Sequence, residues 1–370
     1  MQAIYKEIIR CKSLGLEGVL GTIISTQGST YQKTGAKCFI AGDGQFTGLV
    51  SGGCVEGDLK EIAFQVIENG QPKIVNYNFQ GEGDLLWGLG LGCNGKMNIL
   101  LEPYSPIRDL AKSEQIENWF KLGLCKTIHS ITITKAENPN LVGSKWLVDP
   151  ENQEYYHIPF KGIINDFLDT MDSRPNCTLA QIGGEEEFQV FYDTIAPSPR
   201  IVIFGAGPDA IPLVQMAKNI KWHVTVMDHR PAFINQKNFP EADDLICYNP
   251  GTIPNVRLDE NTYVVIMSHH FSQDQMMLKE VLNSEAAYIG LLGPRKRTYE
   301  LGNGLGLNNH PNQHRIHSPI GLDIGSVTPE EIALSIIAEI SMVYRGGTGN
   351  KLTKGAFHFP SKEDEQLLKV

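Results

Sequence analysis

The segment 200–230 constrains the fold more than any other part of this sequence. It reads RIVIFGAGPDAIPLVQMAKNIKWHVTVMDHR, which predicts a buried strand, a tight glycine turn, a helix and a second strand ending at Asp228. In its G-x-G-x-x-A turn, Gly205 makes the bend and Gly207 admits a pyrophosphate to the backbone. A carboxylate about 20 residues further on can accept hydrogen bonds from ribose hydroxyls. We therefore expect an adenine nucleotide such as NAD to contact Gly205, Gly207 and Asp228.

Two residues in this turn depart from the usual pattern. Pro208 removes a backbone donor, and Asp209 brings a negative charge toward a bound pyrophosphate. That repulsion could exclude the usual dinucleotide. The sequence therefore predicts the βαβ unit and leaves the identity of the nucleotide open.

The rest of the C-terminal half extends the same pattern. DDLICYNP, TYVVIMSHH and AYIGLLGP are further strands that alternate with helical segments, as a doubly wound parallel sheet requires. Thr328 and Glu331 form a capping box at the start of a last helix. We expect a Rossmann-like domain over 200–345, preceded by a proline-containing linker at 193–199 and followed by a mobile tail at 346–370.

The N-terminal part predicts a mixture of helices and strands. A helix over 1–14 is followed by the strands GVLGTIIST and KCFIAG and by an amphipathic helix near 55–68. The middle extension 105–192 contains a helix and short strands but no recognisable chemistry. The expected fold is thus α/β, with an N-terminal α+β domain over 1–192 and a C-terminal Rossmann-like domain.

Two glycine-rich loops in the N-terminal part each carry one thiol. The first contains Ser51, Gly52, Gly53 and Cys54 directly before the amphipathic helix, and the second, GLGLGCNG, contains Cys93 before a strand. Glycines allow close approach to a ligand, and a helix that follows presents unpaired N–H groups. The alternative is that both thiols are small buried residues, as free cysteines commonly are.

Charged side chains also gather at two predicted strand ends. Arg295, Lys296 and Arg297 crowd the start of a helix in GPRKRT, which is unfavourable unless an anion neutralises them. The alternative is that they are solvated or paired with carboxylates. His269 and His270 are either acid/base groups or polar loop residues.

Composition limits the partners. The chain has 370 residues and a formal charge of −10, which argues against binding to nucleic acid or to an anionic membrane. Its seven cysteines form no C-x-x-C pair and fit a reducing compartment, so we expect the cytoplasm. Prolines interrupt the spacing of His310, His314 and His317, so a metal site is not expected there.

Six motifs together resemble one family. They are STQGSTYQKTGAK, GLVSGGCVEGDL, GLGLGCNGKMNILLEP, VIFGAGPDAIPL, IGLLGPRKRT and IHSPIGLDIGSVTPEEIALSIIAEI. The chain resembles the xanthine dehydrogenase accessory factors of the XdhC/CoxI type over most of 1–105 and 195–345. The resemblance implies a non-catalytic carrier and chaperone. Such a protein binds the molybdenum cofactor, protects its sulfurated form and delivers it to a molybdenum hydroxylase of the xanthine dehydrogenase class.

The resemblance also implies site residues. Gly52, Gly53 and Cys54 match the family's S-G-G-C loop, and Cys93 falls where the family usually has a cysteine, although Asn94 replaces the more usual glycine. The matching residues of the last motif are His317, Gly321, Asp323 and Gly325.

Molybdopterin carries a dithiolene-bound metal and a phosphate, so its host needs a sulfur contact and a separate anion cradle. We expect Cys54 and Cys93 at the molybdenum, with Cys54 the more important because its loop also offers free backbone donors. The other expected cofactor contacts are Ser51, Gly52, Gly53, Gly205, Gly207, Asp228, Arg295, Arg297, His317 and Asp323.

Two other functions remain open on the sequence. The same βαβ unit fits an NAD(P)-dependent oxidoreductase, although no convincing proton relay is visible beside the turn. A sulfur-relay protein would instead carry a persulfide on Cys54 or Cys93 from a cysteine desulfurase to the cofactor, and that role is compatible with carrying. Whatever the function, we expect the protein to form a homo-oligomer.

Overall fold

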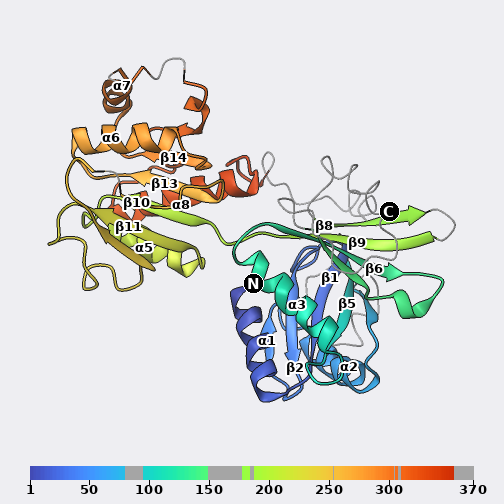
Figure 1. Cartoon of the computed structure of the whole chain (residues 1–370). Helices are drawn as coiled ribbons and strands as arrows, with labels where there is room; N and C mark the ends of the chain where they lie inside the picture. Colours follow the sequence, from blue (N-terminus) through green and yellow to red (C-terminus); the bar gives the residue numbers. More distant parts are fainter. Residues whose placement is uncertain are drawn as a thin grey trace, which may run out of the picture. The chain divides into compact units, whose positions relative to one another are not determined.

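The computed structural model describes residues 1–79, 95–148, 177–183, 187–252, 254–303, 305–306 and 310–353, with the side chains of 183 and 187 left out. The chain divides into two compact units, Met1–Pro197 and Ser198–Val370 (Figure 1). Both units combine helices with sheets, and the C-terminal sheet is parallel, which confirms the expected α/β fold class.

A five-stranded antiparallel sheet forms the centre of the N-terminal unit, in the order β3-β2-β1-β5-β4. Its strands are β1 (Gly18–Gly28), β2 (Lys37–Ala41), β3 (Phe46–Gly48), β4 (Lys73–Asn78) and β5 (Gly95–Tyr104). Strand β2, the first seven residues of β1 and the segment Ile99–Glu102 of β5 are buried on both faces, and most of their residues are apolar.

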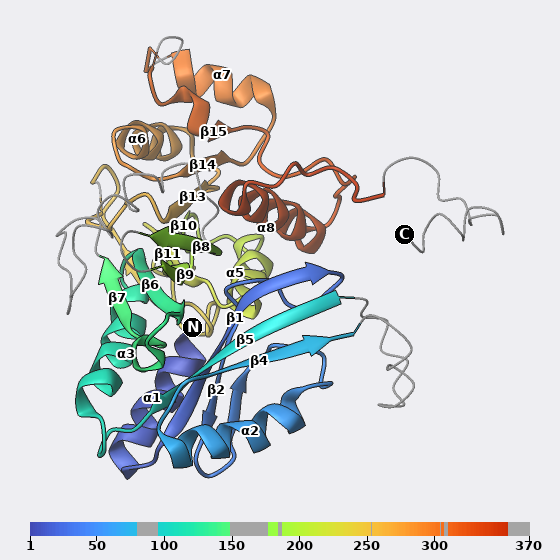
Figure 2. The same cartoon turned by 90° about the vertical axis from the view of Figure 1, so that its right-hand side faces the viewer.

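Helices cover both faces of this sheet. Helix α2 (Glu56–Asn69) packs Leu59, Ala63 and Val66 on one face. Helices α1 (Gln2–Leu14) and α3 (Leu110–Gly123) share a second core with residues of the opposite face, such as Phe39 and Tyr104. Figure 2 shows α1 and α2 beside the strands of this sheet.

A second antiparallel sheet has the order β7-β6-β9-β8. Its strands are β6 (Ile128–Lys135), β7 (Lys145–Val148), β8 (Cys177–Gly183) and β9 (Glu187–Ile195), with the short 3-10 helix η2 (Pro139–Leu141) before β7. It meets the face of the first sheet opposite to α2, where Ile24 and Leu100 pack against Phe191.

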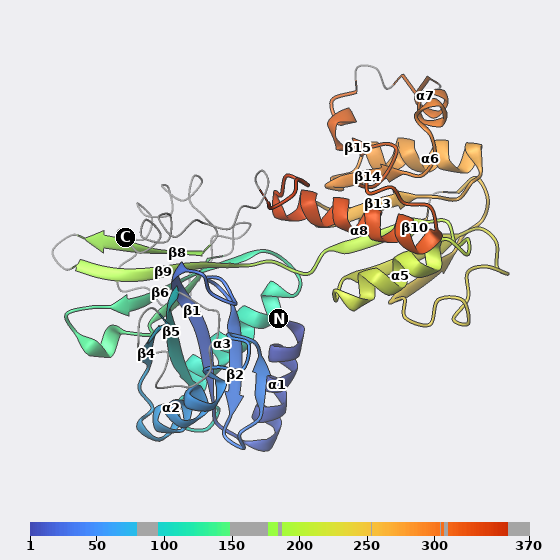
Figure 3. The same ribbon diagram turned by 180° about the vertical axis from the view of Figure 1, so that it is seen from behind.

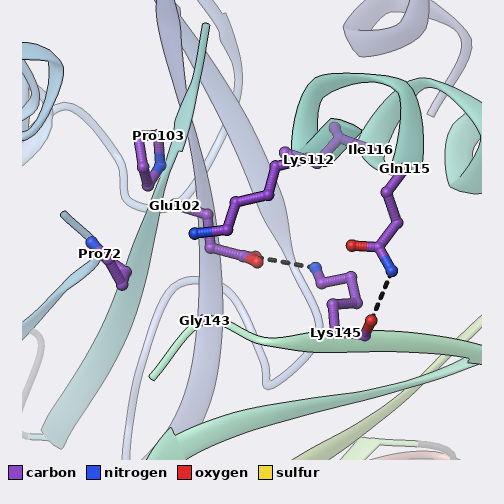
Figure 4. A pocket seen from close by; sticks show the side chains of 8 residues that line it. All are labelled: Pro72, Glu102, Pro103, Lys112, Gln115, Ile116, Gly143 and Lys145. Atoms are coloured by element: carbon purple, nitrogen blue, oxygen red, sulfur yellow. Dashed lines mark hydrogen bonds and ion pairs between the residues drawn. The ribbon is translucent and has the colours of Figure 1, made fainter. Parts of the chain in front are cut away.

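Two buried ion pairs join the two sheets. Lys145 Nζ lies 2.9 Å from Glu102 Oε2 beside a small pocket (Figure 4), and Lys37 Nζ lies 2.5 Å from Asp193 Oδ2. The Trp119 ring lies near both ammonium groups, 3.9 Å from Lys145 Nζ and 5.1 Å from Lys37 Nζ. The predicted linker start at 193 is therefore wrong, because Asp193 is buried in strand β9, which continues to Ile195.

The C-terminal unit contains a six-stranded parallel sheet in the order β12-β11-β10-β13-β14-β15. Its strands are β10 (Arg200–Phe204), β11 (His223–Asp228), β12 (Asp244–Cys247), β13 (Thr262–Ile266), β14 (Tyr288–Leu291) and β15 (Ile316–His317). In chain order this is the 3-2-1-4-5-6 arrangement of dinucleotide-binding sheets, with its switch point between β10 and β13.

Helices lie on both faces of the parallel sheet (Figure 3). One core contains α5 (Ala210–Asn219) and α8 (Pro329–Arg345), and the other contains α6 (Phe271–Leu282) and α7 (Arg295–Asn303). The 3-10 helix η5 (Gln313–Arg315) precedes β15. The predicted capping box is confirmed, since Thr328 Oγ1 accepts from the Glu331 amide and the Glu331 carboxylate accepts from the Thr328 amide at 2.9 Å.

Within the described part of the chain, none of the helices is both long and apolar enough to cross a membrane.

Candidate functional site

Topology brings the N-terminal loops to one edge of the first sheet. The antiparallel register pairs Gly28 with Gly95 and Cys38 with Gly48. The loop between β1 and β2, the loop between β3 and α2, and the start of β5 therefore lie at the same edge. The first of these loops is also in contact with the second, because a Cβ atom added to Gly52 would meet the Tyr31 ring at 3.5 Å.

Cys54 is partly exposed at this edge and packs beside the core under α2. Gly53 has φ +105°, a conformation that glycine adopts readily, and a Cβ atom there would meet nothing within 4 Å. Gly95 is tightly held, since an added Cβ would lie 2.6 Å from the carbonyl oxygens of Gln27 and Ser29. Cys93, the second predicted thiol, lies outside the described residues.

Ser51 corrects one expectation about this loop. The hydroxyl of Ser51 accepts hydrogen bonds from the amides of Gly53, Cys54 and Val55 at 3.0–3.2 Å and donates to the Glu56 carboxylate. The expectation that these amides are free donors for a ligand is wrong for this conformation, because Ser51 takes the place that an anion would occupy. The buried Ser51 side chain shapes the loop.

Glu56 adds a negative charge beneath the loop. Burial raises the pKa of Glu56, but hydrogen bonds from the Ser51 hydroxyl and from the Ser51 and Val55 amides outweigh burial and bring it below its ordinary value. An ionised Glu56 beside Cys54 disfavours an anionic ligand group at this point. The loop is therefore suited to a sulfur contact more than to an anion cradle.

The glycine turn of the parallel sheet adopts the predicted shape. Gly205 has φ +129°, and a Cβ atom there would collide with the carbonyl of Met267, so only glycine lets the turn approach the end of β13. Next to it, Asp209 folds over Gly207, and its Oδ2 lies 2.8 Å from His269 Nε2. His269 itself has φ +60°. This hydrogen bond connects the loops after β10 and β13 across the switch point.

Asp228 is buried and fully engaged by the protein. Its carboxylate accepts from the Ala206 amide at 2.7 Å and from the Arg230 guanidinium at 2.7 and 2.9 Å. Burial alone would raise the pKa of Asp228, but these bonds hold it below its ordinary value. Ribose hydroxyls would have to displace Arg230 to reach it. Nucleotide contact by Asp228, Gly205 and Gly207 stays a prediction.

Two arginines after β14, Arg295 and Arg297, were expected at the cofactor, and the described residues give them different surroundings. Arg297 Nη2 donates to Asp274 Oδ2 at 2.7 Å, so the alternative of pairing with a carboxylate is confirmed for Arg297. Arg295, in contrast to Arg297, lines an open pocket. The ring of His270, the second of the two histidines after β13, meets the ring of His229 edge to face, with 6.0 Å between their centroids.

That pocket lies where β14 and β15 end and is closed on one side by α8. Its volume is about 790 Å³, and its lining includes three residues expected at the cofactor, namely Arg295, His317 and Asp323. The remaining lining combines apolar side chains with serines and Glu339, and it comes mainly from the loop after β15 and from α8. A concave pocket that combines apolar side chains with a few convergent polar groups is the usual form of a ligand site.

Contacts with Tyr288 and Glu339 fix the orientation of the His317 ring. Its ring stacks on buried Tyr288 with 4.3 Å between centroids, and its Nδ1 lies 3.4 Å from Glu339 Oε1. The other Glu339 oxygen accepts from the Tyr288 hydroxyl and from the Gly321 amide, the latter at 2.8 Å. Burial raises the pKa of Glu339, yet the bonds from His317, Tyr288 and Gly321 leave it below its ordinary value.

Sequence reasoning did not include Glu339 or Tyr288. A signal for Glu339 exists, because it follows Ile336 by three residues and precedes Ile340, which places a carboxylate in the buried stripe of the predicted last helix. Tyr288 gives no comparable signal, since an aromatic residue at the start of a buried strand is ordinary. Among the described residues, no cluster of His, Cys, Asp and Glu side chains is arranged to hold a metal ion.

Two family models match this chain, one in each of its two units. Residues 201–340 match the model described as the XdhC Rossmann domain, and residues 12–78 match the XdhC and CoxI family. The chain is 33% identical over 329 residues to a protein of Bacillus subtilis (strain 168) that is described as a probable subunit of xanthine dehydrogenase, covering 88% of this chain and 92% of that protein.

Two further matches span most of the chain. It is 22% identical over 332 residues to the molybdenum cofactor insertion chaperone PaoD of Escherichia coli (strain K12), covering 89% of this chain and 84% of PaoD. A crystal structure described as a xanthine dehydrogenase from Bacillus halodurans superimposes with a TM-score of 0.74 at 32% identity, covering 93% of this chain and 96% of that one.

Proposed function

The chain belongs to the XdhC and CoxI family, and from this premise we propose that it binds the molybdenum cofactor and delivers it to a molybdenum hydroxylase of the xanthine dehydrogenase class. The observation that carries the proposal is similarity along most of the chain to PaoD, a molybdenum cofactor insertion chaperone. The cofactor is cargo in this role, and the protein itself performs no redox chemistry.

The residues of the first loop suit the metal end of this cargo. A thiolate is the soft ligand or contact that a dithiolene-bound metal accepts, and Cys54 is partly exposed at the sheet edge beside the open face of Gly53. Because Ser51 already takes the loop amides, the phosphate end needs a different cradle. We assign the leading sulfur contact to Cys54, with Cys93 in support.

The contacts of the glycine turn favour a carrier over the NAD(P)-dependent oxidoreductase. Asp228 is engaged by Arg230, and Asp209 covers Gly207, so the positions that normally meet ribose and pyrophosphate are taken by protein groups. We therefore expect no turnover of hydroxy acids, aldehydes or purines with NAD(P). A sulfur relay from a cysteine desulfurase through Cys54 remains compatible with carriage.

The test is the cofactor content of the protein purified under anaerobic conditions from a host that makes the cofactor. Bound molybdopterin is oxidised to its fluorescent pterin derivative and quantified together with molybdenum. We expect both to copurify, and to be absent from protein made in a host that lacks cofactor synthesis. Equal background in the two hosts would contradict the proposal, as would robust NAD(P)-linked turnover.

A further inference from the structure

The pocket lined by Arg295, His317 and Asp323 has polar groups that the protein does not use. Among the described residues, the side chains of Arg295 and Asp323 have no hydrogen-bond or ion-pair partner, and none is found for His317 Nε2. Arg295 and Asp323 form no ion pair with each other, so the two charges are free to meet different groups of one ligand. A pocket of about 790 Å³ has room for a small heterocyclic molecule.

His317 is prepared as a fixed polar contact. The Glu339 carboxylate faces Nδ1, so the hydrogen on Nδ1 is directed to Glu339 and Nε2 is the ring nitrogen left for a ligand. The Tyr288 ring stacks on the His317 ring, and the Gly321 amide donates a hydrogen bond to the Glu339 carboxylate, so both members of the pair are held in place. A side chain fixed in this way loses little conformational freedom when a ligand binds.

Each free group selects a complementary part of the ligand. A guanidinium prefers a phosphate, and a carboxylate accepts two parallel N–H bonds when an amino group lies beside a ring N–H. The apolar remainder of the lining, including Leu292, Ile320 and Ile332, suits a flat ring system.

We propose that this pocket binds a phosphorylated fused heterocycle that presents an amino group next to a ring N–H, the chemistry shared by pterins and guanine nucleotides. Asp323 accepts the two N–H bonds, Arg295 binds the phosphate and His317 Nε2 contacts the ring edge. The proposal rests on the proposed function, because the proposed cargo contains a pterin phosphate. All residues that line the proposed binding pocket lie within the C-terminal unit.

The full-length protein is titrated with neopterin monophosphate, whose own fluorescence reports binding. Guanosine monophosphate, adenosine monophosphate and inorganic phosphate then compete for the same site. We expect guanosine monophosphate to displace the probe at least about tenfold better than adenosine monophosphate, because adenine presents a ring acceptor beside its amino group and cannot bond bidentately to a carboxylate. Inorganic phosphate alone is expected to compete weakly. Whichever of neopterin monophosphate and guanosine monophosphate binds more tightly identifies the natural class of ligand.

Two variants locate the site. Asp323→Asn and Arg295→Gln each remove one charge-assisted contact and should weaken probe binding by about 10–100-fold. Lys296→Gln and Glu330→Gln are matched controls, because both residues are exposed neighbours that do not line the pocket. All four positions are on the surface, so the variants should fold, which thermal unfolding verifies.

The proposal is overturned if neither neopterin monophosphate nor guanosine monophosphate binds saturably, or if Asp323→Asn and Arg295→Gln both bind the probe as tightly as the parent protein does. These outcomes can be told apart from failure of the proposed function. A protein that copurifies with cofactor but binds neither probe loses only this pocket assignment. A protein that binds the probes through Asp323 but never carries cofactor loses only the carrier role.

Discussion

At the scale of single residues, the loop around Cys54 is held by its own side chains. The Ser51 hydroxyl oxygen accepts hydrogen bonds from the amides of Gly53, Cys54 and Val55, and the hydroxyl donates a hydrogen bond to the Glu56 carboxylate. A polar network that is satisfied internally keeps its shape without a ligand. The thiol of Cys54 is thus presented on a loop that is already formed when the cargo arrives.

We predict that Cys54→Ser loses bound molybdopterin and still unfolds within a few degrees of the parent protein. Serine is close to cysteine in size, so the loop keeps its fold, but its hydroxyl is a poor partner for a soft metal. Cys125→Ser and Cys247→Ser are controls, since both thiols are exposed elsewhere. Anaerobic purification followed by pterin analysis measures the loss. Full retention of cofactor by folded Cys54→Ser would disprove the assignment, and loss confined to Cys93→Ser would reverse the order of the two thiols.

The Glu339 cluster predicts a pH dependence of stability. Because the folded-state pKa of Glu339 is lowered, its contribution is present above the unfolded-state pKa, near the ordinary value of 4.5, and is lost as the pH falls through the folded-state pKa. Glu339→Gln should therefore reduce the free energy of unfolding at pH 7 and flatten its decline in acid. Urea unfolding from pH 7 to pH 3 measures both. A variant whose decline below pH 4.5 parallels that of the parent protein would show that Glu339 contributes nothing to the acid sensitivity.

At the scale of elements, two buried ion pairs fix how the two N-terminal sheets meet. Lys37 in β2 pairs with Asp193 in β9, 156 residues later in the chain, and Glu102 in β5 pairs with Lys145 in β7. All four side chains are almost entirely buried. Buried pairs often add little net stability, but the loss of one partner leaves an uncompensated charge.

We predict that Lys145→Ala destabilises the protein by about 3–5 kcal/mol, because it leaves the buried Glu102 carboxylate without its partner. The double replacement Lys145→Met with Glu102→Leu should recover most of that loss, since no buried charge remains. Denaturant unfolding of the single and double variants measures the difference. Equal destabilisation of both would show that the ion pair is needed for more than its charge balance.

Elements with a local signature could be predicted from the sequence. The conformation of the turn at Gly205 and the capping box at Thr328 each depend on residues that are close together in sequence. The positions of both were predicted correctly. The ion pair between Lys37 and Asp193 joins residues far apart in sequence, so it has no local signature. The prolines that follow Asp193 therefore led to a predicted linker that begins too early, inside strand β9. The parallel, doubly wound sheet was predicted from the alternation of strands and helices, whereas the order of its strands comes from the structure.

Part of the candidate pocket was named from the sequence. Arg295 came from one motif, and His317 and Asp323 came from the next motif along the chain; the structure places all three in the lining of one pocket. Their contact with a cofactor stays a prediction. Glu339 and Tyr288, which orient His317, come from two other elements and were not predicted. Arg297, two residues from Arg295, is paired with Asp274 instead, because helical geometry points the two side chains in different directions.

At the scale of the whole molecule, each unit carries one candidate site of its own. The N-terminal unit offers a thiol on a preformed loop, and the C-terminal unit offers a pocket with one guanidinium, one carboxylate and one fixed imidazole. A carrier needs affinity for its cargo and the ability to release it, and it needs no catalytic group. The proposed hydroxylase partner and any self-association therefore concern delivery and not chemistry within this chain.

The most direct test of the carrier role is delivery itself. The protein is loaded in a cofactor-producing host, purified anaerobically and mixed with the cofactor-free form of a xanthine dehydrogenase-class hydroxylase, and hydroxylase activity is followed over time. We predict that activity appears in proportion to the cofactor lost from the carrier, and that protein from a host without cofactor synthesis restores none. Loaded protein that keeps its cofactor in the presence of the cofactor-free hydroxylase, or loses it without activating the enzyme, would contradict the account.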